Sequence, residues 1–168
     1  MYHRILVPLD GSLTANQGLS EAIKLAKDQR GRLRLLHIAD ERIVDCGYGP
    51  GTYGGELIES ARVDGHKILS EAQALAQRGG LHAEALLVES MGGPVAALII
   101  EQAKAWPADL IVMGTHGRRG FGRLAMGSDA ESVVRGTPVP VLLVRSTTAQ
   151  PVAATDARTV NSSLGASA

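Results

Sequence analysis

Short apolar runs alternate with helical patterns along most of this chain, and this alternation restricts the possible folds more than any other feature. The expected strands are Arg4–Leu9, Arg32–Ala39, His82–Glu89, Asp109–Met113 and Val139–Val144. The segments between them space their apolar residues as amphipathic helices do, among them Glu56–Arg78 and Asp129–Arg135. Between the first two strands, the residues expected on one helical face are Ala15, Leu19, Ala22, Ile23 and Ala26; before the fourth strand they are Val95, Leu98, Ile99, Gln102 and Trp106. Strands that alternate with helices form a parallel sheet covered on both faces. The sequence therefore predicts a single-domain, doubly wound α/β fold with five strands and about four helices, similar to the Rossmann fold.

Length and composition indicate one ordinary globular domain and exclude several function classes. The 168 residues are 45% hydrophobic, and 17 Lys+Arg balance 17 Asp+Glu. A nucleic-acid binder would normally be basic, and no apolar run has the length of a membrane span. The single cysteine cannot form a disulfide within the chain, which suits a reducing compartment. The N-terminus enters a strand pattern without the layout of a signal peptide. We expect a cytoplasmic protein that neither binds nucleic acid nor inserts into a membrane.

The C-terminal residues differ in kind from the rest. Residues 147–168 are rich in Ala, Ser and Thr and lack aromatic side chains. Such a segment can bury little apolar area. We predict a folded domain over residues 1–146 and a low-complexity, disordered tail over 147–168.

The glycine-rich segment Gly114–Ser128 is the clearest candidate site. It follows an apolar strand and precedes a helix, for which Ser128 is the expected N-cap. Glycines let the backbone approach a ligand closely, and a helix N-terminus offers free N–H groups and the positive end of its dipole. Arg118 adds positive charge. The segment is therefore a candidate phosphate site, with a solvated surface loop as the alternative.

The spacing Gly114-x2-Gly117-x9-Gly127-Ser128 resembles the ATP-binding signature of the universal stress protein family, and the resemblance covers about residues 1–146. It implies the strand order 3-2-1-4-5 of adenine nucleotide alpha hydrolase-like folds, with ATP and Mg²⁺ bound at the carboxyl ends of the first and fourth strands. In that family the position of Asp10 contacts the nucleoside and that of Ile38 contacts adenine through its backbone. The full set of implied ligand contacts is Pro8, Asp10, Ile38, Met113, Gly114, Gly117, Arg118, Gly127, Ser128 and Asp129.

Asp10 has two competing interpretations. Its carboxylate could accept hydrogen bonds from ribose hydroxyls, as acidic residues do in other nucleotide-binding folds. Alternatively, Asp10-Gly11 forms a local turn in which the side chain is satisfied by its own backbone.

His37 lies in an expected strand and is interpreted as a packed, hydrogen-bonded residue, and His116 is interpreted as a solvated loop residue. The sequence shows no metal-ligand spacing and no arrangement of a nucleophile with a base, so we predict neither a catalytic residue nor a protein-held metal. With the family resemblance, this favours an ATP-binding sensor or regulator of the stress response, acting on an unidentified protein partner. The alternatives are a slow ATPase or nucleotide-transferring enzyme, with Asp10 or Glu131 as base, and an interaction module without a ligand.

The fifth expected strand indicates self-association. Val139–Val144 is apolar on both sides, lies at a sheet edge in the implied order, and contains Pro140, which cannot donate to a ladder. An uncovered apolar edge tends to pair with another strand. We therefore expect a twofold homodimer through this strand, as the family resemblance also implies. The alternative is a monomer whose edge the tail covers.

Overall fold

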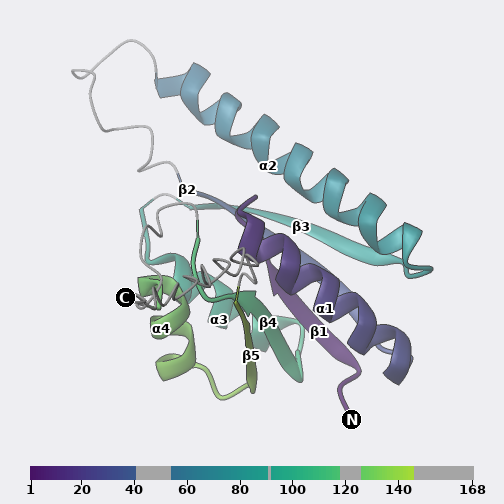
Figure 1. Cartoon of the computed structure of the whole chain (residues 1–168). Coiled ribbons are helices and arrows are strands. Elements are labelled where there is room, and N and C mark those ends of the chain that lie inside the picture. Colours follow the sequence, from purple (N-terminus) through teal and green to yellow (C-terminus); the bar gives the residue numbers. More distant parts are fainter. Residues whose placement is uncertain (41–53, 91, 118–125, 146–168) are drawn as a thin grey trace, which may run out of the picture.

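The computed structural model describes residues 1–40, 54–90, 92–117 and 126–145. Within these ranges, five parallel strands form one sheet in the order β3-β2-β1-β4-β5 (Figure 1). The strands are β1 (Arg4–Pro8), β2 (Arg32–Asp40), β3 (Ala83–Ser90), β4 (Leu110–Gly114) and β5 (Val141–Val144). The helices are α1 (Leu13–Gln29), α2 (Gly54–Arg78), α3 (Val95–Ala105) and α4 (Ser128–Gly136). The predicted fold class and strand order are confirmed.

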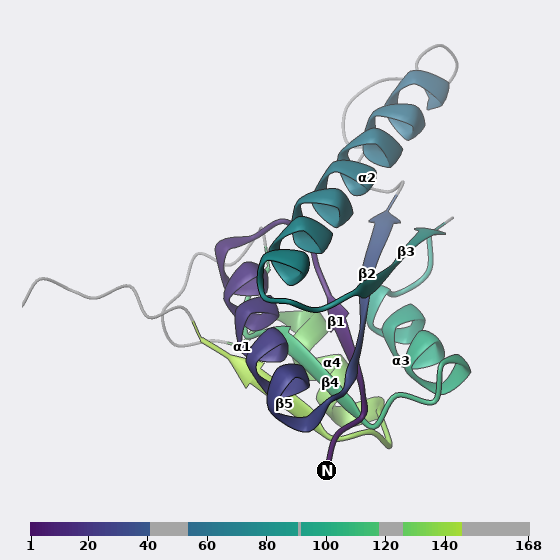
Figure 2. The same ribbon diagram turned by 90° about the vertical axis from the view of Figure 1, so that its right-hand side faces the viewer.

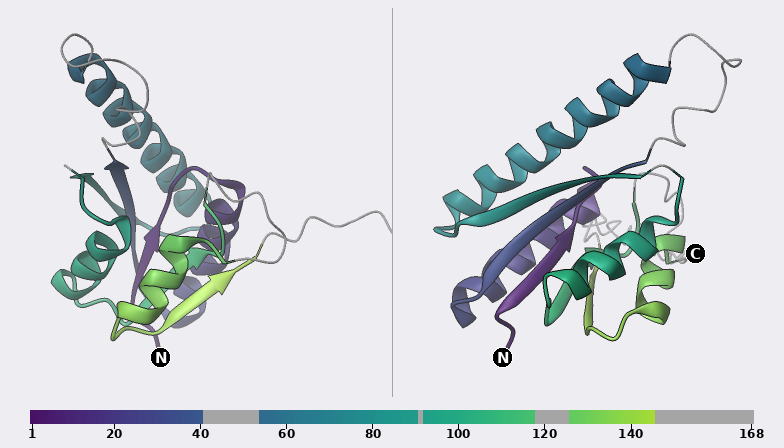
Figure 3. Two further views of the ribbon diagram at one scale, coloured as in Figure 1. Left: turned by 90° about the vertical axis from the view of Figure 1, so that its left-hand side faces the viewer. Right: turned by 180° about the vertical axis from the view of Figure 1, so that it is seen from behind.

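Each face of the sheet is covered by two helices. Side chains of α1 and α2 pack on Ile5 and Val7 of β1, whereas those of α3 and α4 pack with Leu6 on the opposite face (Figures 2 and 3). Successive strand residues point to opposite faces, so a strand that is buried on both must be apolar at every position. β4 satisfies this condition, because all of its residues are buried.

The strand order creates a reversal beside β1. β1 pairs with β2 on one side, where Pro8 is the register partner of Leu36, and with β4 on the other, where Leu6 partners Ile111. The chain first builds outward from β1 to β3 and then returns to the other side of β1. The carboxyl ends of β1 and β4 therefore meet at the point where ligands bind in open α/β sheets.

Two element boundaries differ from the sequence prediction. β5 begins at Val141, so Pro140 lies just outside it, although the Pro140 carbonyl still accepts a hydrogen bond from the Ile111 amide at 2.9 Å. The N-cap of α4 is Gly127, and the prediction of Ser128 as that cap is wrong by one residue. Among the described residues, no side chain caps this helix; instead the Gly127 carbonyl accepts the Glu131 amide at 2.9 Å.

The buried stripe of α3 is also shifted by one position from the expected face. Its buried residues are Ala96, Ile99 and Ala103, rather than the stripe that includes Val95 and Trp106. Small alanines let a helix lie close to a sheet, which leaves the larger side chains at the margins of the contact. By contrast, the face predicted for the first helix is confirmed, since Ala15, Leu19, Ala22, Ile23 and Ala26 are all buried.

Candidate functional site

The turn between β1 and α1 places Asp10 at the carboxyl end of β1. The Ser12 amide donates to Asp10 Oδ1 at 2.9 Å, and Gly11 between them has a φ of 79°, which favours glycine. Ser12 then caps α1, its hydroxyl accepting from the Ala15 amide at 3.2 Å. The local turn expected of Asp-Gly is therefore present, and it uses one of the two carboxylate oxygens.

The other Asp10 oxygen lies against the glycine-rich segment. A Cβ atom built on Gly117 would stand 2.6 Å from Asp10 Oδ2, which is closer than real contacts allow. The two motifs, far apart in sequence, thus meet at the carboxyl edge of the sheet.

The first turn of α1 packs directly on the end of β4. A Cβ on Gly114 would lie 2.9 Å from the Thr14 carbonyl carbon and 3.0 Å from the Ala15 nitrogen, so only glycine fits there. The Thr14 hydroxyl also donates to the His116 carbonyl and lies 3.1 Å from the Ser12 hydroxyl. These contacts fix the start of α1 relative to the glycine segment.

The N-terminus of α4 is tied to the same place. The Gly127 amide donates to the Thr115 carbonyl at 2.8 Å, and a Cβ on Gly127 would lie 3.3 Å from that oxygen. Asp129 and Glu131 lie in the first turn of α4, where their charge complements the helix dipole. Any phosphate at this helix end must therefore share the positive field with two carboxylates.

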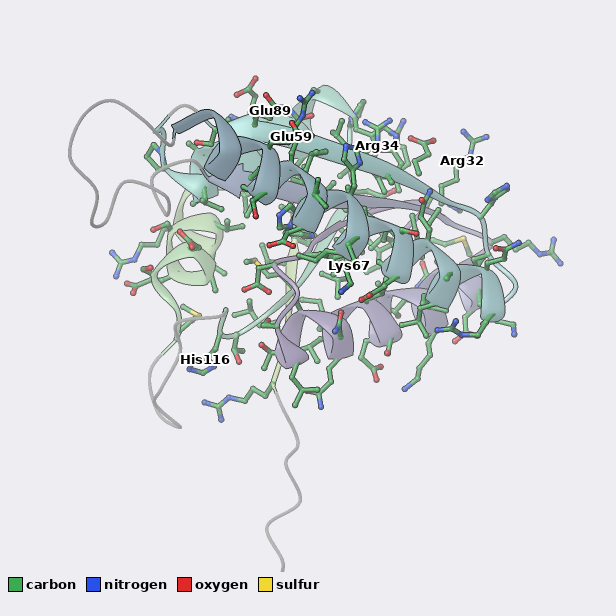
Figure 4. The ribbon with its side chains drawn as sticks, turned by 90° about the horizontal axis from the view of Figure 1, so that it is seen from above. Arg32, Arg34, Glu59, Lys67, Glu89 and His116 are labelled. Atoms are coloured by element: carbon green, nitrogen blue, oxygen red, sulfur yellow. The ribbon has the colours of Figure 1, made fainter. Side chains whose placement is uncertain are left out.

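His116 was expected to be a solvated loop residue, but it is partly buried. Its Nδ1 lies 2.9 Å from the Thr115 hydroxyl, and its buried Nε2 has no hydrogen-bond partner within the part of the chain that the structure describes. Figure 4 shows His116 beside the beginning of α1. No local sequence pattern predicts this burial, because it depends on the packing of Thr14 against the His116 backbone.

The carboxyl end of β2 is joined to the Asp10 turn. The buried His37 places Nδ1 2.7 Å from the Leu9 carbonyl, and the Leu9 amide donates to Leu36 at 2.8 Å. A Cβ on Gly65 of α2 would lie 2.7 Å from the His37 ring. His37 is thus a packed, hydrogen-bonded residue as expected, and it holds the strand that carries Ile38 against the turn.

The remaining expected contacts lie at the same edge with different exposure. Pro8 is the last residue of β1 and Ile38 is partly buried near the end of β2. The Met113 side chain is packed in the core, so only its backbone faces the edge, whereas Ser128 and Asp129 are exposed. Arg118 lies outside the described residues.

Within the described ranges of the chain, no group of three or more His, Cys, Asp or Glu side chains is placed to hold a metal ion. None of the described helices is long and apolar enough to cross a membrane.

Together, the fold and the site define a doubly wound α/β domain with a glycine-lined edge at its topological switch point, the class of domain that binds ligands outside the carboxyl ends of its strands. Residues 1–145 match the model of the universal stress protein family. The chain belongs to this family.

Known members of the family are similar to this chain over nearly the same residues. The universal stress protein YxiE of Bacillus subtilis is 32% identical over 151 residues, which cover 86% of this chain and 100% of that protein. A solved universal stress protein from Burkholderia pseudomallei is 34% identical, with a TM-score of 0.70 and coverage of 86% and 97%. Another, solved in complex with cAMP, is 28% identical, with a TM-score of 0.61 and coverage of 87% and 98%.

Proposed function

We propose that this protein binds ATP at the carboxyl ends of β1 and β4 and that the bound nucleotide regulates a protein partner in the stress response. The observation that carries the proposal is the contact between Asp10 and Gly117 beside the N-terminus of α4. A family member in complex with cAMP supports an adenine nucleotide as the ligand class.

The residues present fit the parts of the nucleotide. Because Gly117 and Gly127 have no side chains, a phosphate could approach their backbone closely. The first backbone amides of α4 would hold the phosphate oxygens. Asp10 would accept hydrogen bonds from the ribose, and the Ile38 backbone would contact adenine, as the family pattern implies. Mg²⁺ would be bound chiefly through the phosphates and water, since the described residues offer no cluster of ligands for it.

The test is to purify the protein, extract bound nucleotides under denaturing conditions, and follow added Mg·ATP over hours. Retained, unconverted ATP supports a nucleotide-binding regulator. Conversion to ADP would instead favour the slow ATPase, and a site that binds no adenine nucleotide would contradict the proposal.

A further inference from the structure

A cluster of basic residues lies at the opposite end of the sheet, where β1 and β2 begin. His3, Arg4, Arg30 and Arg32, here called the basic cluster, line a cavity of about 400 Å³ together with Asp109. Figure 4 shows Arg32 and His116 at opposite ends of the molecule. The cavity is therefore separate from the edge where we place ATP.

Arg4 and Arg32 are register partners on neighbouring strands, and both are exposed. Side chains of register partners stand side by side on the same face of a sheet, where like charges repel. Among the described residues, no ion pair involves Arg4, Arg30 or Arg32.

Arg34, farther along β2, shows the contrasting case. Its guanidinium lies 2.6 Å from Glu84 of β3 and stacks over the Trp106 ring at 4.6 Å from the centroid. One arginine of β2 therefore has a carboxylate partner, whereas Arg32 faces Arg4.

Asp109 is the one acid among the described residues that line this cavity. Its Oδ2 accepts the His3 amide at 2.8 Å and its Oδ1 accepts the Arg4 amide at 3.0 Å. Both oxygens thus help to fix the start of β1. With three guanidinium groups and one carboxylate, the cavity has an excess of two positive charges when His3 is neutral.

The backbone of Arg30 gives an independent observation. Arg30 follows α1 with φ 53° and ψ 36°, the left-handed conformation that usually selects glycine at a helix end. An arginine there is strained, and Lys27 already supplies a positive charge in the last turn of α1. A side chain kept in a strained position beside two unpaired arginines indicates a use for its guanidinium.

We propose that the basic cluster binds a compact, phosphate-bearing anion of two or more charges. Guanidinium groups bind phosphate oxygens in pairs, and the excess charge of the cavity matches such an anion. The chain as a whole is neutral, with 17 basic and 17 acidic residues, so its charge does not favour a long polyanion. The phosphate would come either free in solution or attached to a small metabolite.

Calorimetric titration of the full chain with inorganic pyrophosphate tests the proposal. We expect saturable binding that Arg32→Gln weakens about tenfold or more, whereas Arg78→Gln on α2 leaves it unchanged. Pyrophosphate can also occupy the glycine segment where we place the phosphates of ATP, so Arg32→Gln is also tested in the Gly127→Val background, where the Arg32-dependent binding should persist. Loss of all binding in Gly127→Val with retention in Arg32→Gln would overturn the proposal and assign the anion to the glycine segment; loss of ATP binding alone would not affect it.

Arg30→Gly separates binding from folding. Glycine relieves the left-handed strain, so this variant should melt at a higher temperature without ligand and yet bind pyrophosphate more weakly. Higher stability with unchanged affinity would contradict the proposal.

Comparison with glycerol phosphate distinguishes free from attached phosphate. Tighter, Arg32-dependent binding of a single-stranded oligonucleotide would show a polymer site instead and overturn the compact-anion assignment.

Discussion

At the scale of single residues, Gly127 offers the most direct test of the ATP site. Replacing it with Val puts a branched side chain near the Thr115 carbonyl and His116, where phosphate must approach. We expect a wild-type dissociation constant on the order of micromolar, about −8 kcal/mol, and a loss of about tenfold or more in Gly127→Val. Calorimetry with Mg·ATP measures both values.

Gly93→Val is the matched control, because a Cβ at Gly93 would meet nothing within 4 Å. It should bind ATP as the wild type does. Equal affinity in the wild type and in Gly127→Val would show that the phosphates lie elsewhere.

Two substitutions of Asp10 separate its role in the turn from its proposed role in binding ribose. Asp10→Ala removes the acceptor of the Ser12 amide and should lower the free energy of unfolding by about 1 kcal/mol. Asp10→Asn keeps an acceptor for that amide, so its melting temperature should stay close to the wild-type value. Both variants should bind ATP more weakly, because the ribose loses a carboxylate partner. Full ATP affinity in Asp10→Asn would restrict Asp10 to its turn.

Residue-level inference from the sequence succeeded where local chemistry decides the structure. Asp10-Gly11-Ser12 forms the expected turn and cap because all of its partners lie within a few residues. It failed at Ser128, since the cap position follows from the bond between the Gly127 amide and the distant Thr115 carbonyl. The burial of His116 had no local signal for the same reason.

At the scale of elements, β5 is the exposed edge of the sheet. It pairs with β4 alone among the described strands, and Leu142 is 37% exposed. We predict a homodimer in which β5 pairs antiparallel with its copy, and Val141→Lys should shift it toward monomer by placing like charges near the twofold axis. Light scattering at micromolar concentration measures the change.

Val63→Lys on α2 is the control for this prediction, since Val63 is a similarly branched residue that is 57% exposed and far from β5 in sequence. It should leave the assembly unchanged. A monomeric wild type, or a dimer insensitive to Val141→Lys, would contradict the predicted interface.

Element types and order could be inferred from the sequence because apolar spacing reports burial directly. The face of α1 was predicted correctly, since its stripe is made of residues that are buried in any packing on a sheet. The face of α3 was not, because the choice between Val95 and Ala96 depends on how closely the helix approaches the sheet. The basic cluster could not be predicted from the sequence either, because Arg4 and Arg30 come together only through the pairing of β1 with β2.

At the scale of the whole molecule, the two buried clusters are formed by residues between Tyr2 and Val144. Truncation after Ser146 should therefore leave the melting temperature and the ATP affinity unchanged. Thermal unfolding and calorimetry of the shortened chain check both. A fall of several degrees would show that residues 147–168 pack on the domain, and a dimer that persists without them would confirm that the tail is not its interface.

The pairing of β1 with β4 also determines the stage of folding at which the proposed site can form. Asp10 leaves the ribosome well before its partner Gly117 and the helix start at Gly127, because about a hundred residues separate them in the sequence. Contacts between such distant residues form late and slowly in folding. We therefore expect a nucleotide bound at the proposed site to assist only the last stage of folding.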